Sequence, residues 1–185
     1  MVVLGIDPGS QRCGFGVVSR SGARLSRLAS GVLVPGRALC AAERLGLILE
    51  QLTALLEGGG IHAVAIESAF CGRSPRSALA LGQARGVAMA AAARRGLPVF
   101  EYAPAEVKRA FTGSGRAEKA QMIRTARALF GVEARLADEA DALAVAVCHL
   151  AQPAARAPAP RRGGAAALAR TGVLRRAVRR YREAP

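Results

Sequence analysis

The sequence predicts an α/β fold in which helices flank a mixed β-sheet. Three apolar segments separated by turn residues open the chain, and helical and strand-like patterns alternate after them. Three successive strands form an antiparallel meander, whereas a strand, a helix and a second strand form a parallel crossover, so the sheet combines both pairings. With 185 residues, of which 51% are hydrophobic, the chain is long enough for one domain with a substantial core.

The three N-terminal segments predict the meander. Residues 2–7 (VVLGID) form an apolar run that ends at Asp7, and the turn PGSQR follows. Residues 13–20 (CGFGVVSR) predict the second strand, whose glycines indicate that another part of the backbone approaches closely. The third strand is predicted within residues 23–34 (ARLSRLASGVLV).

The middle of the chain alternates between helix and strand. Leucine and isoleucine recur at helical spacing over residues 45–56, and three glycines at 58–60 end this pattern. A buried strand, a long helix of small residues and a short strand are predicted next, at residues 61–70 (IHAVAIESAF), 77–96 and 98–102 (PVFEY).

The remainder of the folded region is predicted to be helical, at about 104–112, 117–130 and 137–151. From Gln152 onward the chain is rich in Pro, Ala, Gly and Arg, with nine arginines against one glutamate. Such a segment has too few large apolar side chains to offset the entropy lost on ordering. We therefore expect one domain over residues 1–151 and a flexible basic tail over 152–185.

The net charge of +14 favours a polyanionic partner, most simply nucleic acid. The four cysteines form no C-x-x-C pair, so neither a zinc site nor a disulfide framework is indicated, and a reducing compartment fits best. No apolar run is long enough for a membrane span, and no basic segment precedes the first one as in a signal peptide. We expect a soluble, cytoplasmic protein.

Four carboxylates are candidates for one site. Asp7 and Glu67 each lie at the carboxyl end of a strand that runs parallel to the other, where open α/β sheets place their ligands. Asp138 and Asp141 share one face at the start of the last helix. Four carboxylates at one locus cannot all stay ionised without cations, and carboxylate oxygens favour Mg²⁺ or Mn²⁺. The sequence therefore predicts a divalent metal site.

Each of these acids also has a simpler interpretation. Asp138 and Asp141 together are typical of a helix start, where acids cap the first turn. Glu67 is able to pair with an arginine, and Asp7 to orient the turn at Pro8-Gly9. These alternatives leave unexplained why all three aspartates and one glutamate at a strand end fall where a single fold collects them.

Several longer motifs resemble the RuvC family of Holliday junction resolvases, the bacterial crossover junction endodeoxyribonucleases. The resemblance covers residues 1–151 and rests on GIDPGS with Gly14-Phe15-Gly16, AIESAF, SALALGQARG, VFEYAPAEVKRAFTGSGRAEKAQM and ADEADALAVAVCHL. It implies the ribonuclease H-like fold, a five-stranded mixed sheet with helices on both sides. It also implies that the carboxylate quartet of Asp7, Glu67, Asp138 and Asp141 is catalytic.

The same resemblance implies an enzyme of homologous recombination and DNA repair. Two Mg²⁺ ions per site, with Mn²⁺ as a substitute, would straddle the scissile phosphate and leave 5′-phosphate and 3′-hydroxyl ends. The family is homodimeric, so paired symmetric nicks across a four-way junction are expected, and the RuvA-RuvB branch-migration complex is the expected partner. An alanine face on the predicted helix at 77–96 suits either the dimer interface or the core of the chain itself, and consists of Ala80, Ala84, Ala88 and Ala91.

Five further residues are expected to bind DNA. Phe70 matches an aromatic residue that the family places against junction bases, and Arg73 and Arg76 lie in a predicted exposed loop. Lys108 and Lys119, the only lysines, match basic family positions beside the site. The alternatives are a core phenylalanine and solvated helix residues.

Three other classes of protein compete with this interpretation. Actin-like ATPases and sugar kinases also open with a strand, an aspartate and a glycine turn, but their duplicated domain does not fit into 185 residues. A non-catalytic basic DNA-binding module explains the charge and leaves the four acids unexplained. Another ribonuclease H-like nuclease is the nearest alternative.

Overall fold

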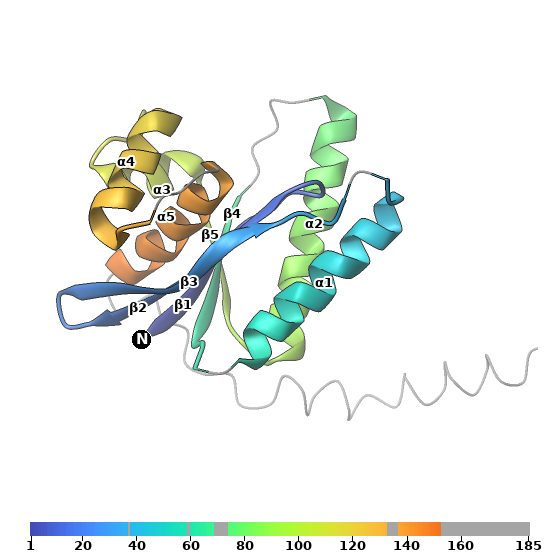
Figure 1. Cartoon of the computed structure of the whole chain (residues 1–185), viewed down its shortest axis with the longest axis horizontal. Helices are drawn as coiled ribbons and strands as arrows, with labels where there is room; N and C mark the ends of the chain where they lie inside the picture. The colour runs from blue at the N-terminus through green and yellow to red at the C-terminus, as the bar shows by residue number, and fades with distance from the viewer. Residues whose placement is uncertain (37, 59, 69–73, 133–136, 153–185) are drawn as a thin grey trace, which may run out of the picture.

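The computed structural model describes all residues except 37, 59, 69–73, 133–136 and 153–185 (Figure 1). Among the described residues, five strands and five helices follow one another in the predicted order. They are β1 (Val2–Asp7), β2 (Cys13–Ser21), β3 (Arg24–Leu33), α1 (Ala41–Glu57), β4 (Ala63–Glu67), α2 (Pro75–Arg94), β5 (Val99–Tyr102), α3 (Pro104–Thr112), α4 (Lys119–Phe130) and α5 (Ala137–Ala151).

The strands form a single five-stranded sheet in the order β3-β2-β1-β4-β5. The first three strands pair in antiparallel fashion, whereas β4 pairs in parallel with both β1 and β5. The predicted fold class, a mixed five-stranded sheet with helices on both sides, is thereby confirmed. Most of the predicted ends agree within two residues, but α1 begins earlier than its leucine pattern because the Glu43 carboxylate accepts the backbone N–H of Cys40, 2.7 Å away.

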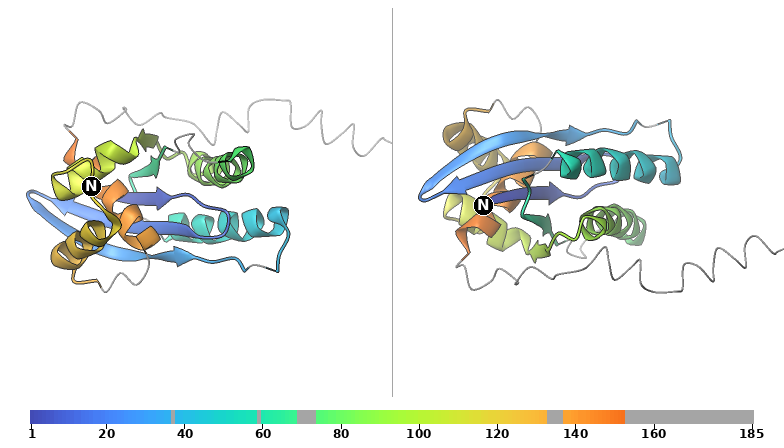
Figure 2. Two further views of the ribbon diagram at one scale, coloured as in Figure 1. Left: turned by 90° about the horizontal axis from the view of Figure 1, so that it is seen from above. Right: turned by 90° about the horizontal axis from the view of Figure 1, so that it is seen from below.

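Helices cover both faces of the sheet (Figures 1 and 2). Alternate residues of each strand point to opposite faces. On β1, Val3 belongs to the apolar core shared with α3, α4 and α5, whereas Leu4 and Ile6 belong to the core shared with α1 and α2. The molecule therefore has two cores, the α5 core and the α1–α2 core, separated by the sheet.

The alanine face of α2 is packed mainly inside the chain. Ala84, Ala88 and Ala91 are each at most 2% exposed, and Ala80 is half-buried. Of the two roles expected for this face, the structure shows the internal one, because α2 packs its alanines towards α1 and the sheet. The outward face of α2 instead carries Leu79, which is 66% exposed.

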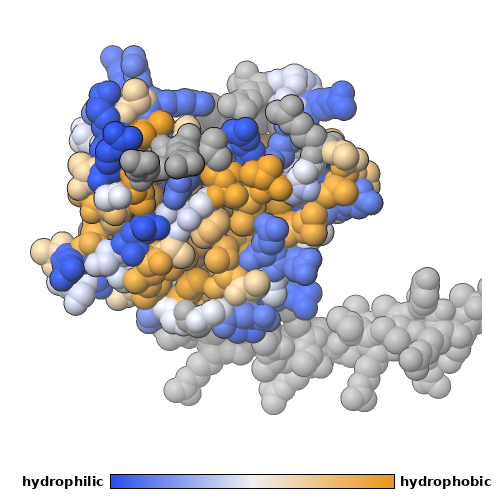
Figure 3. Space-filling model, viewed as in Figure 1, coloured by the Kyte–Doolittle hydropathy of each residue, from blue (hydrophilic) through white to orange (hydrophobic). Residues whose placement is uncertain are grey.

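Strand β3 forms one edge of the sheet. Figure 3 shows apolar side chains gathered on the face that carries β3 in Figure 1. Leu28 within β3 and Val34 just after it are both more than half exposed. Among the residues described, no helix has the length and apolar character needed to cross a bilayer.

Candidate active site

Asp7 and Glu67 lie next to each other at the ends of two central strands. Ile6 of β1 pairs with Ile66 of β4 in parallel register, and each acid is the next and last residue of its strand. By the alternation of side chains, both acids point to the face covered by α5, as their neighbours Val3 and Ala65 do. The predicted convergence of these two strand ends is therefore present.

Helix α5 reaches the sheet through glycines. A methyl group added at Gly5 would lie 2.2 Å from the carbonyl oxygen of Ala142, and one added at Gly14 would lie 2.0 Å from that of Asp138. No real side chain tolerates such contacts, so α5 lies against bare backbone. Gly14 is the antiparallel partner of Asp7, and the first turn of α5 is thus placed beside Asp7.

The four acids act on one another electrostatically. Burial raises the pKa of Asp7 to about 8, and three negative charges add to this rise: those of Glu67, Asp141 and Asp138. Burial and the charge of Asp141 raise the pKa of Glu67 to about 7. Burial is also the main cause of the raised pKa of Asp141. The structure brings the four predicted carboxylates into one electrostatic cluster.

Two lysines offset part of this negative charge. Lys119, the first residue of α4, lowers the pKa of Asp7 and of Asp141. Lys108 on α3 acts in the same way on Glu67 and Asp141. The only lysines of the sequence therefore both act on the carboxylate quartet, as their predicted positions beside the site require.

The donor set suits a hard divalent cation. Carboxylate oxygens bind Mg²⁺ and Mn²⁺, and such a cation relieves the repulsion that raises these pKa values. Within the part of the chain that the structure describes, no three Asp, Glu, His or Cys side chains stand close enough together to form a ready-made metal site. The four acids of the quartet are thus close enough to shift one another's pKa, but their side chains do not converge on a single point.

Two contacts at the start of α5 had no signal in the sequence. The Nη1 of Arg12, in the turn between β1 and β2, lies 3.9 Å from Oδ2 of Asp138. The hydroxyl of Ser30 on β3 donates to Oε1 of Glu139 at 2.6 Å. Both contacts join residues that are far apart in the chain. A local sequence pattern shows that an arginine or a serine is present, but it does not show which distant residue that side chain contacts.

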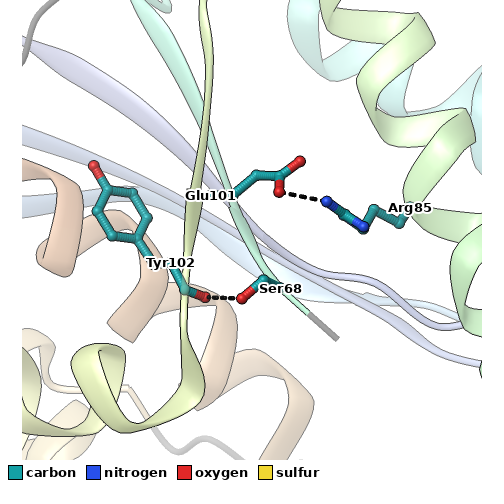
Figure 4. Close-up of polar contacts among 4 residues, drawn as sticks. All are labelled: Ser68, Arg85, Glu101 and Tyr102. Atoms are coloured by element: carbon teal, nitrogen blue, oxygen red, sulfur yellow. Dashed lines mark hydrogen bonds and ion pairs between the residues drawn. The ribbon is translucent and has the colours of Figure 1, made fainter. Parts of the chain in front are cut away.

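The end of β4 is fixed to its neighbour β5. The backbone N–H and the hydroxyl of Ser68 both donate to the carbonyl oxygen of Tyr102, at 2.8 and 3.0 Å. Arg85 of α2 forms an ion pair with Glu101 of β5, as Figure 4 shows. These contacts hold β5 to the end of β4 and to α2. They thereby fix the end of β4, where Glu67 lies.

The remaining predicted DNA-contacting residues precede or begin α2. Arg76 lies in its first turn and is exposed, after the N-cap Ser74, whose hydroxyl accepts the backbone N–H of Ser77. Phe70 and Arg73 lie outside the described residues. Arg76 is therefore on the surface, as a phosphate contact requires.

Both histidines make structural contacts. The Nδ1 of His62 accepts the backbone N–H of Val2 at 3.1 Å. His149 is buried in the α5 core, where its Nδ1 lies 2.7 Å from the hydroxyl of Tyr102 and its ring packs on Phe100. Both rings thus support the packing of strand and helix ends.

Comparison with known proteins gives a consistent result. The family model for crossover junction endodeoxyribonuclease RuvC matches residues 3–149. The RuvC of Anaeromyxobacter sp. strain K is 66% identical over 90% of this chain and 89% of its own length. The RuvC of Myxococcus xanthus is 49% identical over 91% and 92%. The structure of Thermus thermophilus RuvC in complex with a Holliday junction substrate superimposes with a TM-score of 0.75, at 37% identity over 81% of this chain and 93% of that one.

Proposed function

This chain belongs to the RuvC family of crossover junction endodeoxyribonucleases, and from this membership we propose that its carboxylate quartet cuts four-way junctions with bound divalent cations. The fold is ribonuclease H-like, and the chain is a nuclease, a hydrolase of DNA that resolves Holliday junctions in recombination and repair. Such a nuclease needs groups that hold cations at the scissile phosphate, and the quartet offers oxygen ligands for them.

The electrostatic cluster of Asp7, Glu67, Asp138 and Asp141 carries the proposal. Acids that raise one another's pKa at the end of a sheet are kept there at a cost to stability, which a cation offsets. These residues would hold two Mg²⁺ ions, with Mn²⁺ as a substitute. When bound, such ions supply an activated water for in-line attack and stabilise the leaving 3′ oxygen, giving 5′-phosphate and 3′-hydroxyl ends.

Basic residues around the quartet would hold the DNA backbone. Lys108 and Lys119 already act electrostatically on the acids, so a phosphate at the quartet would lie within reach of their charge. Arg76 stands exposed at the start of α2, after the segment that contains Phe70 and Arg73. We assign phosphate contacts to the lysines and arginines and base stacking to Phe70.

A homodimer would give one quartet for each of the two symmetric cuts, because a single chain holds only one. The outward face of α2 suits this interface better than the internal alanines. It exposes Leu79 and Met89, and a methyl group added at Gly82 or Gly86 would meet no atom within 4 Å. Exposed glycines weaken a helix, but their bare backbone lets the same helix of a second copy approach closely.

Two further expectations rest on family membership alone. We propose RuvA and RuvB as the partners that bring this nuclease to a junction, and the cytoplasm as its location.

The arginine-rich tail would add sequence-independent affinity for DNA.

The test uses a synthetic four-way junction and a linear duplex containing the sequence of one arm pair. With Mg²⁺, we expect paired cuts at symmetric positions on the junction alone. Asp7→Asn should abolish cleavage and leave junction binding in Ca²⁺ intact, since phosphate contacts provide most of the affinity. Glu57→Gln, whose side chain is exposed at the C-terminal end of α1, is the matched control. Equal cleavage of the linear duplex would favour another ribonuclease H-like nuclease, and loss of binding by folded Asp7→Asn would contradict the metal-ligand role.

A further inference from the structure

Arg12 forms a long ion pair with one member of the carboxylate quartet, Asp138. Its Nη1 lies 3.9 Å from Oδ2 of Asp138, with the arginine side chain 52% exposed and the aspartate side chain 31% exposed. The ion pairs of Arg85 with Glu101 and of Arg95 with Glu57 include no member of the quartet.

The fold holds the pair of Arg12 and Asp138 together through backbone packing. Arg12 lies one residue before β2, and Gly14 packs against the carbonyl oxygen of Asp138 itself. The backbone of the turn between β1 and β2 is therefore anchored at the first turn of α5, and the Cα of Arg12 stays near Asp138 even when the contact of their side chains breaks.

The positive charges are divided among the four acids. Lys119 acts on Asp7 and Asp141, and Lys108 acts on Glu67 and Asp141. Asp138 forms an ion pair, and its partner is Arg12. The pair is long and solvent-exposed, so it is weak and easily exchanged for a stronger partner.

We propose that Arg12 is a resident counter-charge for Asp138, which competes with a divalent cation for this carboxylate and so sets the metal affinity of the quartet. The inference rests on the proposed metal-ligand role of Asp138. A divalent cation carries twice the charge of the guanidinium and binds the oxygen directly, so it displaces Arg12. Arg12 thus lowers the affinity of the quartet for divalent cations, so that a higher cation concentration is needed to fill the site.

Mn²⁺ titration of the full chain without DNA tests this, with calorimetry as the readout. Arg12→Gln should bind Mn²⁺ about 3 to 10 times more tightly than the wild type, because a positive charge that repels the cation is removed from beside Asp138. Arg12→Lys keeps the charge and should stay near the wild-type affinity. Arg24→Gln removes an exposed arginine at the opposite end of the sheet and should change nothing. Circular dichroism confirms that each variant is folded.

Unchanged or weaker Mn²⁺ binding by folded Arg12→Gln would overturn the proposal, as would a gain of equal size in Arg24→Gln. Asp138→Asn in the same titration separates this failure from that of the proposed function. If Asp138→Asn weakens binding while Arg12→Gln has no effect, the role of Arg12 is wrong and the metal site stands. If Asp138→Asn also leaves the affinity unchanged, Asp138 is no ligand and both proposals fall.

Discussion

The two faces of the sheet are built from different residues. On the α5 face, Gly5, Gly14 and Gly16 let the helix backbone approach the strands, and the acids of the quartet occupy the strand ends. On the α1–α2 face, the same strands present larger branched side chains, among them Leu4, Ile6, Val64 and Ile66. All four acids of the quartet belong to the α5 face or to α5 itself.

The α5 face fixes the position of a helix, whereas the α1–α2 face mainly buries apolar surface. The close contacts of α5 with the backbone of Gly5 and Gly14 fix its position, and that position determines how near Asp138 and Asp141 lie to Asp7. Large aliphatic side chains bury more apolar surface and tolerate small shifts, because neighbouring side chains can rearrange. Substitutions at the glycines of the α5 face should therefore reduce catalysis as well as stability, whereas substitutions in the α1–α2 core should reduce stability alone.

The largest effect is expected for Gly14→Ala on the α5 face. The added methyl group would lie 2.0 Å from the carbonyl oxygen of Asp138, so the first turn of α5 must move. Displacement of catalytic groups by about 1 Å typically costs about 100-fold in rate, and we expect at least that loss in junction cleavage. Single-turnover rates at saturating Mg²⁺ measure it.

The control for Gly14→Ala is the same substitution at Gly46 of α1, where the new methyl group meets no atom within 4 Å. Gly46→Ala should cleave at the wild-type rate. A Gly14→Ala variant that also cleaves at the wild-type rate would show that the close approach of α5 does not position the quartet.

On the opposite face, Leu52→Ala should mainly reduce stability. Leu52 is completely buried between α1 and the sheet, and its truncation leaves a cavity that costs about 2 to 5 kcal/mol. Urea denaturation measures this loss, and junction cleavage at 25 °C should stay within about twofold of the wild type for the folded fraction. A large fall in cleavage without a fall in stability would contradict the division between the faces.

The sequence predicted the strands, the helices and the positions of the acids better than it predicted the contacts between distant segments. The apolar runs that end in Asp7 and Glu67 placed both acids at the carboxyl ends of parallel strands, and the glycines of residues 13–20 indicated a close backbone approach, which α5 makes. These features were predictable because a strand or helix repeats its pattern locally. The same holds for the order of the elements.

Contacts between distant segments were not predictable. The hydrogen bond from Ser30 to Glu139 spans 109 residues, and nothing in either neighbourhood signals it. Helical spacing likewise defined an alanine face on α2, but only the packed structure shows that α1 and the sheet cover it and that Leu79 faces outward. A periodic pattern identifies a face without identifying what the face contacts.

The smallest expected effect is a dependence of the free energy of unfolding on pH, measured in EDTA and caused by the acids of the quartet. The pKa of Asp7 rises from 3.8 to about 8, so between these values the folded chain holds a proton that the unfolded chain has released. The free energy of unfolding therefore decreases as the pH rises through this range. The raised pKa of Glu67, about 7, acts in the same direction.

Asp7→Asn removes the largest part of this dependence. Without metal, the variant should be more stable than the wild type by about 1 to 3 kcal/mol at pH 8, and the two should converge towards pH 4, where the wild-type Asp7 is protonated in the folded state. Thermal unfolding in EDTA at several pH values measures the difference.

Glu57→Gln on the α1–α2 side should follow the wild-type curve, since Glu57 is exposed. Mg²⁺ should stabilise the wild type at pH 8 and have far less effect on Asp7→Asn. Parallel curves for wild type and Asp7→Asn would mean that the α5 face holds its acids without electrostatic cost, and the contrast between the two faces would then be one of packing alone.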